Sequence, residues 1–418
     1  MLLDSLLHRF AAYPAAWSRH LAWRAQAVRW QRRGGLSAEQ LAATEAAYPL
    51  ACFRPAWPIR VVLFVVTLLG VSLGSSFAGL VVASGGSFEH FSVLAWAVLV
   101  LAGALLMLEV VIRNNNLYHA GPDNALLYAA VGGAAVLIGR LRLLRLDGSL
   151  NDFALAQPAL LPSLLLLLAV LLAAGVRYAE RGVTGAAFIT YLLLVANLLL
   201  PWGWGRLLRP FAMMAAAGAI IWLARAPLRA TAAAYYYEGP RQTLRLLGLA
   251  VLYLAGNYLV VREGNAALHG DYMSAHPPLG GLFIFFTAAV PLAYITLGLR
   301  RADRLLLTLG LVAFAFSGYT LRTYRSVLPP AVAATLAGAA LVAIAVFALR
   351  YLRPARHGLT SLPDAGGDDA DDAANPFARA NLEALAAAEL TPVPPPDAGP
   401  RTEFGGGEFG GGGASSGY

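Results

Sequence analysis

The chain has 418 residues, of which 58% are hydrophobic and only 13% are charged, whereas a soluble protein usually carries about 25% charged residues. Together with a mean hydropathy of +0.62, this composition excludes a soluble globular enzyme and a wholly disordered chain. The formal net charge is +8, yet residues 1–360 hold 29 arginines against 13 acids, and residues 361–418 hold two arginines against ten acids. A basic body with an acidic tail favours contact with the anionic headgroups of a lipid bilayer and argues against nucleic acid as a partner.

Residues 1–59 predict amphipathic helices that lie in the cytoplasm or at the membrane interface. Pro14 is placed to open a helix that carries three tryptophans among several arginines, a composition typical of an interfacial helix. Gly34-Gly35 end that helix. Ser37-Ala38-Glu39-Gln40 is a capping box, which predicts a second, short helix that ends near Ala47.

Residues 60–351 predict an all-α bundle of about ten membrane-spanning helices, since a span needs about 20 mostly apolar residues. The ten segments are 61–83, 93–112, 125–139, 155–176, 185–204, 207–224, 244–261, 279–299, 305–321 and 331–351. The third is short, because Asn124 and Arg140 bracket only 15 residues. It is compatible with a core helix or a re-entrant segment as well as with a span.

The distribution of arginine favours ten crossings, because cytoplasmic loops are enriched in basic residues. With ten spans and a cytoplasmic N-terminus, the cytoplasmic segments carry 23 arginines and the loops on the other side carry 8. Without the third span, the division becomes 17 and 14. We therefore predict a multi-pass protein with both termini in the cytoplasm.

Residues 352–418 predict a largely disordered cytoplasmic tail that is first acidic and then rich in proline and glycine. Asn375-Pro376 is a favourable start for one short helix over residues 376–390. The chain ends with the glycine-rich sequence Phe404–Gly413 and a few small residues.

Two of these segments resemble known families. Gly35-Leu36-Ser37-Ala38-Glu39-Gln40, followed by a polytopic body, is similar to the N-terminal helix start of an uncharacterised bacterial family of membrane proteins. This resemblance implies the bacterial inner (cytoplasmic) membrane and no known activity. The glycine-rich end resembles the tails of TPM-domain membrane proteins. The soluble TPM domain itself is not found in this sequence, so that resemblance implies at most a shared handling of the tail by a common partner.

The sequence contains no Gly-x-Ser-x-Gly, no His-Glu-x-x-His, no Walker A loop and no cysteine pair. We therefore predict no catalytic residue, no metal site and no cofactor, and we lean against an enzyme. The densest polar stretch between spans is 114–124. Its Asn114, Asn116, His119 and Asp123 are candidates for binding a headgroup or a cation, although the same residues are ordinary in turns and helix caps.

A second polar loop is predicted over residues 262–278, on the side opposite the cytoplasm. Its His269, Asp271 and His276 are residue types that ligate metals. In a loop, however, their spacing is equally that of solvated residues.

Polar residues inside spans are costly and are therefore candidates for function. Glu109 lies near the end of its span, one helical turn before Arg113, which predicts an interfacial ion pair rather than a buried proton site. Asn197 and Asn257 lie well inside their spans, where we expect them to join neighbouring helices. Tyr235-Tyr236-Tyr237 resemble an aromatic belt at the membrane interface.

Three hypotheses about function follow. The first is a non-catalytic scaffold or accessory subunit that recruits a protein partner through its N-terminal helices or its tail, because the spans carry few charges whereas the water-facing ends are elaborate. The second is a transporter or channel for a weakly polar or lipid-like substrate, with a cavity lined by the in-span asparagines. The third is a membrane enzyme that acts on a lipid or a glycan at one of the two polar loops.

Overall fold

The computed structural model describes residues 10–32, 34–84, 89–146, 158–225, 232–269, 274–301 and 303–325, with isolated positions between 332 and 350. Across these residues the protein is helical and contains no strand, apart from an isolated bridge between Phe53 and Leu117. The fold is therefore an all-α helix bundle, as the sequence predicts. The predicted tenth span lies outside the described residues except for those isolated positions. The tail helix 376–390 lies entirely outside them.

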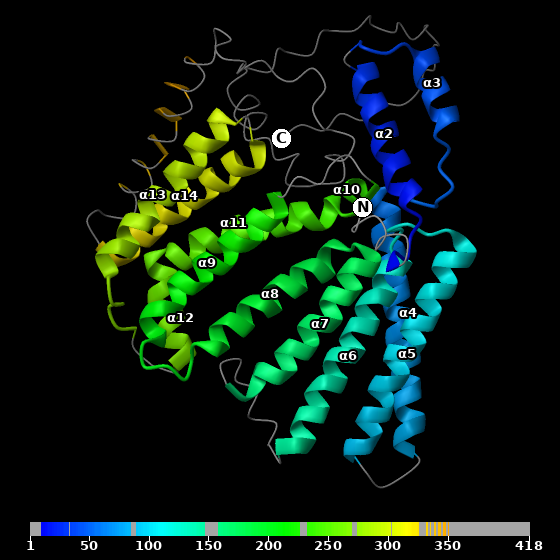
Figure 1. Cartoon of the computed structure of the whole chain (residues 1–418), viewed down its shortest axis with the longest axis horizontal. Helices are drawn as coiled ribbons and strands as arrows, with labels where there is room; N and C mark the ends of the chain where they lie inside the picture. The colour runs from blue at the N-terminus through cyan, green and yellow to red at the C-terminus, as the bar shows by residue number, and fades with distance from the viewer. Residues whose placement is uncertain are drawn as a thin grey trace, which may run out of the picture. The chain divides into compact units, whose positions relative to one another are not determined.

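The described helices are α2 (Ala15–Arg32), α3 (Ala38–Ala47), α4 (Trp57–Ser84), α5 (Glu89–Asn115), α6 (Pro122–Leu146), α7 (Leu161–Tyr178), α8 (Arg181–Leu198), α9 (Gly205–Arg225), α10 (Ala232–Tyr236), α11 (Glu238–Gly256), α12 (Tyr258–His269), α13 (Gly280–Arg300) and α14 (Arg304–Arg325), with a 3-10 turn η2 (Pro158–Leu160) before α7. Pairs of helices close in sequence pack against each other, notably α5 with α6, α7 with α8, α9 with α11 and α13 with α14 (Figure 1).

Local sequence signals set the two N-terminal helices. The helix α2 begins directly after Pro14, and the chain leaves it through Gly34, whose φ of +74° suits glycine. The capping box at the start of α3 is confirmed. The Ser37 hydroxyl accepts from the backbone N–H of Gln40 (3.2 Å), and the Gln40 side chain accepts from the backbone N–H of Ser37 (2.9 Å).

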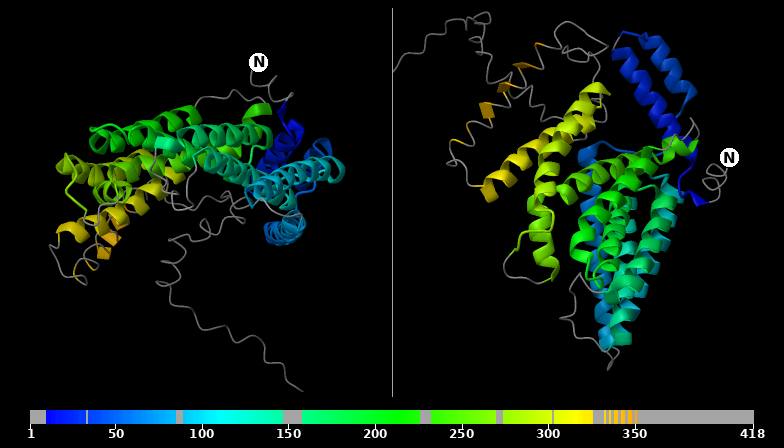
Figure 2. Two further views of the ribbon diagram at one scale, coloured as in Figure 1. Left: turned by 90° about the horizontal axis from the view of Figure 1, so that it is seen from below. Right: turned by 60° about the vertical axis from the view of Figure 1, so that its left-hand side comes forward.

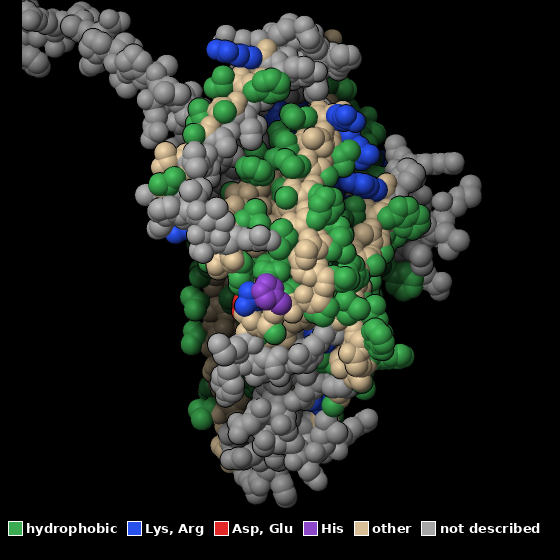
Figure 3. All heavy atoms as spheres, turned by 90° about the vertical axis from the view of Figure 1, so that its left-hand side faces the viewer, with side chains coloured by type: hydrophobic (Ala, Val, Ile, Leu, Met, Phe, Trp, Pro, Cys, Tyr) green, Lys and Arg blue, Asp and Glu red, His purple; other side chains and the backbone are tan. Residues whose placement is uncertain are grey.

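Within the described residues, eight helices are long and apolar enough to cross a membrane, so the chain is an integral, multi-pass membrane protein. Their spanning parts are Trp57–Val81, Val93–Asn115, Pro122–Arg142, Leu161–Tyr178, Arg181–Leu198, Leu207–Arg225, Gly280–Arg300 and Arg304–Tyr324. Helices α11 and α12 are long and apolar enough only when taken together, and the sharp bend between them fits either a broken ninth span or a re-entrant loop. Figure 3 views the side of α13 and α14, where hydrophobic side chains run along the face and basic ones gather mainly near its upper end.

The third of these helices is longer than the sequence predicts. It begins at Pro122 and continues past Arg140 to Leu146. Arginines close to a membrane interface extend their charged ends to water while the backbone stays helical. They therefore end the apolar run without ending the helix, and the 21 residues of Pro122–Arg142 are enough for a span.

The predicted seventh span, residues 244–261, is not one continuous helix. It is broken at Asn257, where α11 and α12 meet at 83°. The Asn257 side-chain oxygen accepts from the backbone N–H groups of Leu259 (3.0 Å) and Val260 (3.3 Å). An asparagine that satisfies the first free N–H groups of a helix is a helix cap, so Asn257 begins a new helix here. Residues 262–269, predicted as loop, belong to α12.

Segments far apart in the sequence meet at one end of the bundle, where α2 and α3 also lie (Figures 1 and 2). The backbone N–H of Ala12 donates to the carbonyl of Arg177 (2.9 Å), and the Tyr13 hydroxyl donates to Asp123 (2.8 Å). The start of α6 and the end of α7 are therefore at the same end, so the chain runs away along α6 and returns along α7. This geometry supports a third helix that crosses the bundle fully rather than one that re-enters.

Candidate functional site

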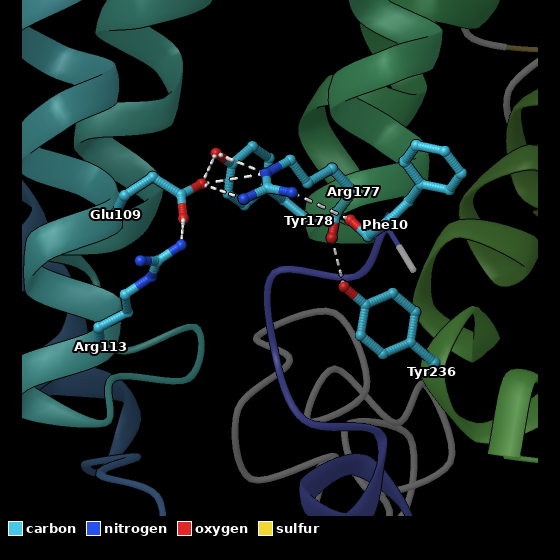
Figure 4. Close-up of polar contacts among 6 residues, drawn as sticks. All are labelled: Phe10, Glu109, Arg113, Arg177, Tyr178 and Tyr236. Atoms are coloured by element: carbon cyan, nitrogen blue, oxygen red, sulfur yellow. Dashed lines mark hydrogen bonds and ion pairs between the residues drawn. The ribbon is translucent and has the colours of Figure 1, made fainter. Parts of the chain in front are cut away.

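Arg177, in the last turn of α7, connects three parts of the chain (Figure 4). Its backbone carbonyl accepts the N–H of Ala12 (2.9 Å) and the hydroxyl of Tyr236 in α10. Its guanidinium donates to the carbonyl of Phe10 (3.2 Å) and, through two nitrogens, to one carboxylate oxygen of Glu109 in α5 (3.0 and 2.6 Å). We call this set the Arg177 junction.

Glu109 is the acidic centre of the junction. The oxygen that faces Arg177 also accepts the hydroxyl of Tyr178 (2.7 Å), and the other oxygen lies 3.7 Å from Arg113. The sequence predicts the pair with Arg113, but the closer pair is with Arg177, 68 residues away. The exposed fractions of the Glu109, Arg177 and Arg113 side chains are 26%, 38% and 76%. These values indicate an interfacial ion pair rather than a buried charge.

Asp123, in the first turn of α6, is completely buried. One carboxylate oxygen accepts the Tyr13 hydroxyl (2.8 Å), and the other accepts the backbone N–H groups of Ala120 (2.9 Å) and Gly121 (3.1 Å). A carboxylate at a helix N-terminus is favoured by the helix dipole. Donors occupy both oxygens, so Asp123 fixes the turn before α6 and holds the N-terminal segment rather than offering an open cation site.

The turn between α5 and α6 has an unusual backbone. Asn116 and His119 have positive φ angles of 50° and 46°, and Gly121 has a φ of 115°. A Cβ atom at residue 121 would lie 2.4 Å from the carbonyl oxygen of Arg60 in α4, a contact that real Cβ atoms do not make. Glycine is therefore required at this position, which brings the turn directly against the start of α4.

Burial controls the titration of the two aromatic side chains at this turn. Burial first, and then the Asp123 carboxylate, raises the pKa of Tyr13 well above its usual value, so Tyr13 remains a neutral donor. Burial lowers the pKa of His119, although Asp123 and a hydrogen bond to Asn124 oppose that shift. The rings of His119, Tyr13 and Tyr118 pack against one another, and the His119 centroid lies 5.2 Å from that of Tyr13 and 4.7 Å from that of Tyr118.

An apolar groove extends from the Arg177 junction along three helices. It has a volume of about 500 Å³, with α6 beneath it and α5 and α7 on its two sides. Its charged end holds Glu109, Arg113 and Arg177, and the rest is lined by Leu101, Leu105, Leu127, Ala130, Val131, Val170, Ala173 and Ala174, with Tyr178 beside the charges.

A second polar cluster surrounds the helix break at Asn257. The Asn257 amide nitrogen donates to the hydroxyl oxygens of Tyr253 (3.0 Å) and of Thr320 in α14 (3.1 Å). The hydroxyl groups of Tyr253 and Ser317 lie 2.8 Å apart, and Thr287 in α13 accepts the backbone N–H of Tyr258 (2.9 Å). These side chains satisfy one another, so the cluster holds α11, α12, α13 and α14 together.

The other predicted site residues lie apart from the Arg177 junction, and His276 contacts the second cluster through Tyr258. Asn114 is exposed in the last turn of α5, and the backbone carbonyl of Asn116 accepts the N–H of Phe53 (2.9 Å). Asn197 is buried and donates to the carbonyl of Leu193 one turn earlier in its own helix (2.8 Å). His276 is exposed and shares a hydrogen bond with the Tyr258 hydroxyl (2.7 Å).

His269 ends α12, but its side chain lies outside the described residues, as does the whole of Asp271. The loop site suggested by these two residues and His276 therefore stays a prediction. Within the described part of the chain, no three histidine, cysteine or acidic side chains gather as a metal site.

Sequence reasoning named Glu109 but missed Arg177 and Tyr236, which join it in the junction. Tyr236 is only 2% exposed and bonds to Arg177, and the Tyr235 hydroxyl accepts the indole N–H of Trp23 (3.2 Å). The predicted aromatic belt is therefore wrong for Tyr236, which faces the protein and bonds to the same Arg177 carbonyl that accepts the N–H of Ala12. The sequence shows three consecutive tyrosines between two predicted spans, but it does not show which partner each tyrosine has.

Comparison with known proteins gives no relative. No protein-family model, no curated protein and no solved structure matches this chain.

Proposed function

We propose that this protein is a non-catalytic scaffold or accessory subunit of the bacterial inner membrane. It presents its N-terminal hairpin, helices α2 and α3, as a docking platform for a protein partner on the cytoplasmic side. The observation that carries this proposal is that the N-terminal region is attached at three separate places, to Asp123 in α6, to Arg177 in α7 and to Tyr235 in α10. A helix that only rests on lipid does not need such attachments.

The hairpin is also fixed internally. Arg24 in α2 forms an ion pair with Glu45 in α3 (3.1 Å), and Trp23 packs edge-on against Tyr48 (4.5 Å between ring centroids). None of the residues of α3 is buried, and Trp30 near the end of α2 is half exposed. A surface that is already ordered loses less entropy when a partner binds, and exposed tryptophan is typical of binding hot spots.

Affinity capture in mild detergent tests this proposal. The full chain is compared with a double variant on the exposed hairpin surface, Trp30→Ala with Glu39→Arg, and with Trp202→Ala, which removes a tryptophan exposed in the turn after α8. We expect a specific partner with the full chain and with Trp202→Ala, and its loss with the double variant. A partner that is kept by the double variant but lost when the chain is truncated after Arg356 would place docking in the tail. Capture of no specific partner by any form would contradict the scaffold.

A transporter of a lipid-like substrate is the second candidate, favoured by the broken span at Asn257. Discontinuous helices with polar residues at the break form the substrate sites of many transporters. Proteoliposomes that contain fluorescent phosphatidylcholine test this alternative through chemical quenching of the outer leaflet. Transport predicts faster exchange between leaflets with the wild type than with Asn257→Ala. Equal rates in empty liposomes and in proteoliposomes would exclude movement of this lipid.

A further inference from the structure

We propose that the groove between α5, α6 and α7 binds one acyl chain of an anionic phospholipid. Arg113 and Arg177 hold the lipid phosphate at the charged end of the groove, which we call its mouth. This inference goes beyond the scaffold function and does not depend on it. Three observations identify this lipid as the ligand.

The first observation is the length of the groove. On α5 its lining runs from Leu101 to Arg113, and these residues follow one another every fourth position on one face of the helix. Twelve residues of α-helix extend about 18 Å. One leaflet of the hydrocarbon core is about 15 Å deep, so the groove matches one leaflet with its headgroup rather than a whole bilayer.

The second observation is where the charges lie. Glu109, Arg113 and Arg177 stand together at one end of the groove, at the last turns of α5 and α7 and near the start of α6. Apolar side chains line the remainder. This distribution matches an amphiphile with its polar group at the membrane surface and its chain in the bilayer, and the volume of about 500 Å³ lies in the range of small-molecule sites.

The third observation is the sign of the charge. Two arginines face one carboxylate, so the mouth carries a net positive charge. Arg113 is 76% exposed and touches Glu109 only at 3.7 Å. Among the described contacts, Arg177 uses three of the five N–H groups that a guanidinium offers. Guanidinium groups pair strongly with phosphate oxygens, and Figure 4 shows the Arg113 and Arg177 guanidinium groups both extending toward the Glu109 carboxylate.

The role of Glu109 in this site is to position the arginines. It receives two hydrogen bonds from Arg177 and one from Tyr178, and these hold the guanidinium at the mouth. The mouth also lies at the end of the bundle that the arginine distribution predicts to be cytoplasmic. The cytoplasmic leaflet is the one with a negative surface potential from anionic lipids.

Native mass spectrometry of the full chain, purified in neutral detergent, tests the proposal. The protein is offered equal amounts of phosphatidylglycerol and phosphatidylcholine with the same acyl chains. We expect the wild type to retain one phosphatidylglycerol in preference to phosphatidylcholine. Arg113→Gln is expected to reduce that retention about tenfold, and Ala173→Trp, which fills the groove, to remove both lipids.

Matched variants control for unspecific effects. Arg300→Gln removes an arginine from the last turn of another long apolar helix, and Leu292→Trp adds a tryptophan at an exposed position of the same helix. Both should bind as the wild type does. Arg177→Gln is a further test, but it also breaks the junction, so it is interpreted only when its melting temperature in detergent equals that of the wild type.

Three results would overturn the proposal. Equal retention of the two lipids by the wild type, or unchanged phosphatidylglycerol binding in both Arg113→Gln and Ala173→Trp, would show that the groove does not select this ligand. Loss of both lipids in Ala173→Trp without any effect of Arg113→Gln would show an apolar acyl-chain groove, and the assignment of an anionic headgroup would be wrong.

Discussion

At the scale of single residues, the hydrogen bond from the Tyr13 hydroxyl to Asp123 holds the N-terminal region against α6. The carboxylate is completely buried, and Tyr13 is its one described side-chain donor. The neighbouring N–H groups of Ala120 and Gly121 serve the other oxygen. Removing the Tyr13 hydroxyl therefore leaves a buried carboxylate oxygen of Asp123 without this donor. An unsatisfied buried group costs more free energy than the loss of an exposed hydrogen bond.

Tyr13→Phe is expected to lower the free energy of unfolding by about 1–3 kcal/mol. The measurement is thermal unfolding of the purified protein in detergent. Tyr319→Phe serves as the control, because Tyr319 is 57% exposed on α14 and the change should be nearly neutral there. Equal melting temperatures for the Tyr13 and Tyr319 variants would show that the bond does not contribute to stability.

His119 makes the same turn sensitive to pH. Its folded-state pKa lies below the value of about 6.5 for an unfolded histidine, so the unfolded state binds more protons below neutrality. The contribution of neutral His119 to the free energy of unfolding is complete above about pH 6.5, and it decreases as the pH falls toward the folded-state pKa. Comparison of the wild type and His119→Gln at pH 7.5 and 5.5 should show a smaller loss of melting temperature in the variant. The same loss in both would assign the effect to other groups.

At the scale of the helix, the break between α11 and α12 is stabilised by the hydrogen bonds of Asn257 and is not a weak point. One side chain caps α12 and also reaches Thr320 in α14. A lost helix cap costs about 0.5–2 kcal/mol, and a lost hydrogen bond between membrane helices costs about 0.6 kcal/mol on average.

We therefore expect Asn257→Ala to destabilise the protein by about 1–3 kcal/mol in detergent. Asn114→Ala, at an exposed position of α5, should have little effect. A stable Asn257→Ala protein would mean that Thr287 and Ser317 alone maintain the joint.

Sequence patterns predict what depends on neighbouring residues. The capping box at Ser37 follows from four consecutive residues, and the long apolar helices follow from hydropathy. The end of α6 is missed, because Arg140 stops the apolar run whereas the backbone continues. The break at Asn257 is missed, because an asparagine in an apolar segment fits a buried polar contact as well as a helix cap.

The junction shows why the candidate site is harder to predict. Arg177 and Glu109 are 68 residues apart, and Tyr13 and Asp123 are 110 apart. No spacing rule links such positions, so only the packing of the helices reveals the pairs. The nearer pair of Glu109 with Arg113 is visible in the sequence because both residues lie on one helix.

At the scale of the whole molecule, the predicted topology assigns each loop to one side of the membrane. In a Cys52→Ser background, single cysteines at residues 39 and 114 should react with a membrane-impermeant maleimide only from the cytoplasmic side. A cysteine at residue 202, in the turn after α8, should react only from the other side. Labelling of the cysteines at 114 and 202 from the same side would contradict the crossing order.

The attachment of the N-terminal segment has a consequence for biogenesis. Ala12, Tyr13 and Trp23 leave the ribosome before their hydrogen-bond partners Asp123, Arg177 and Tyr235, which are made about 110 to 210 residues later. At about 5–20 residues per second, the segment waits roughly 10 to 40 seconds for its last partner. Until that last partner is made, after six spans, the segment must remain outside the membrane with only some of its contacts formed. A segment in this position is a natural client for a chaperone during synthesis.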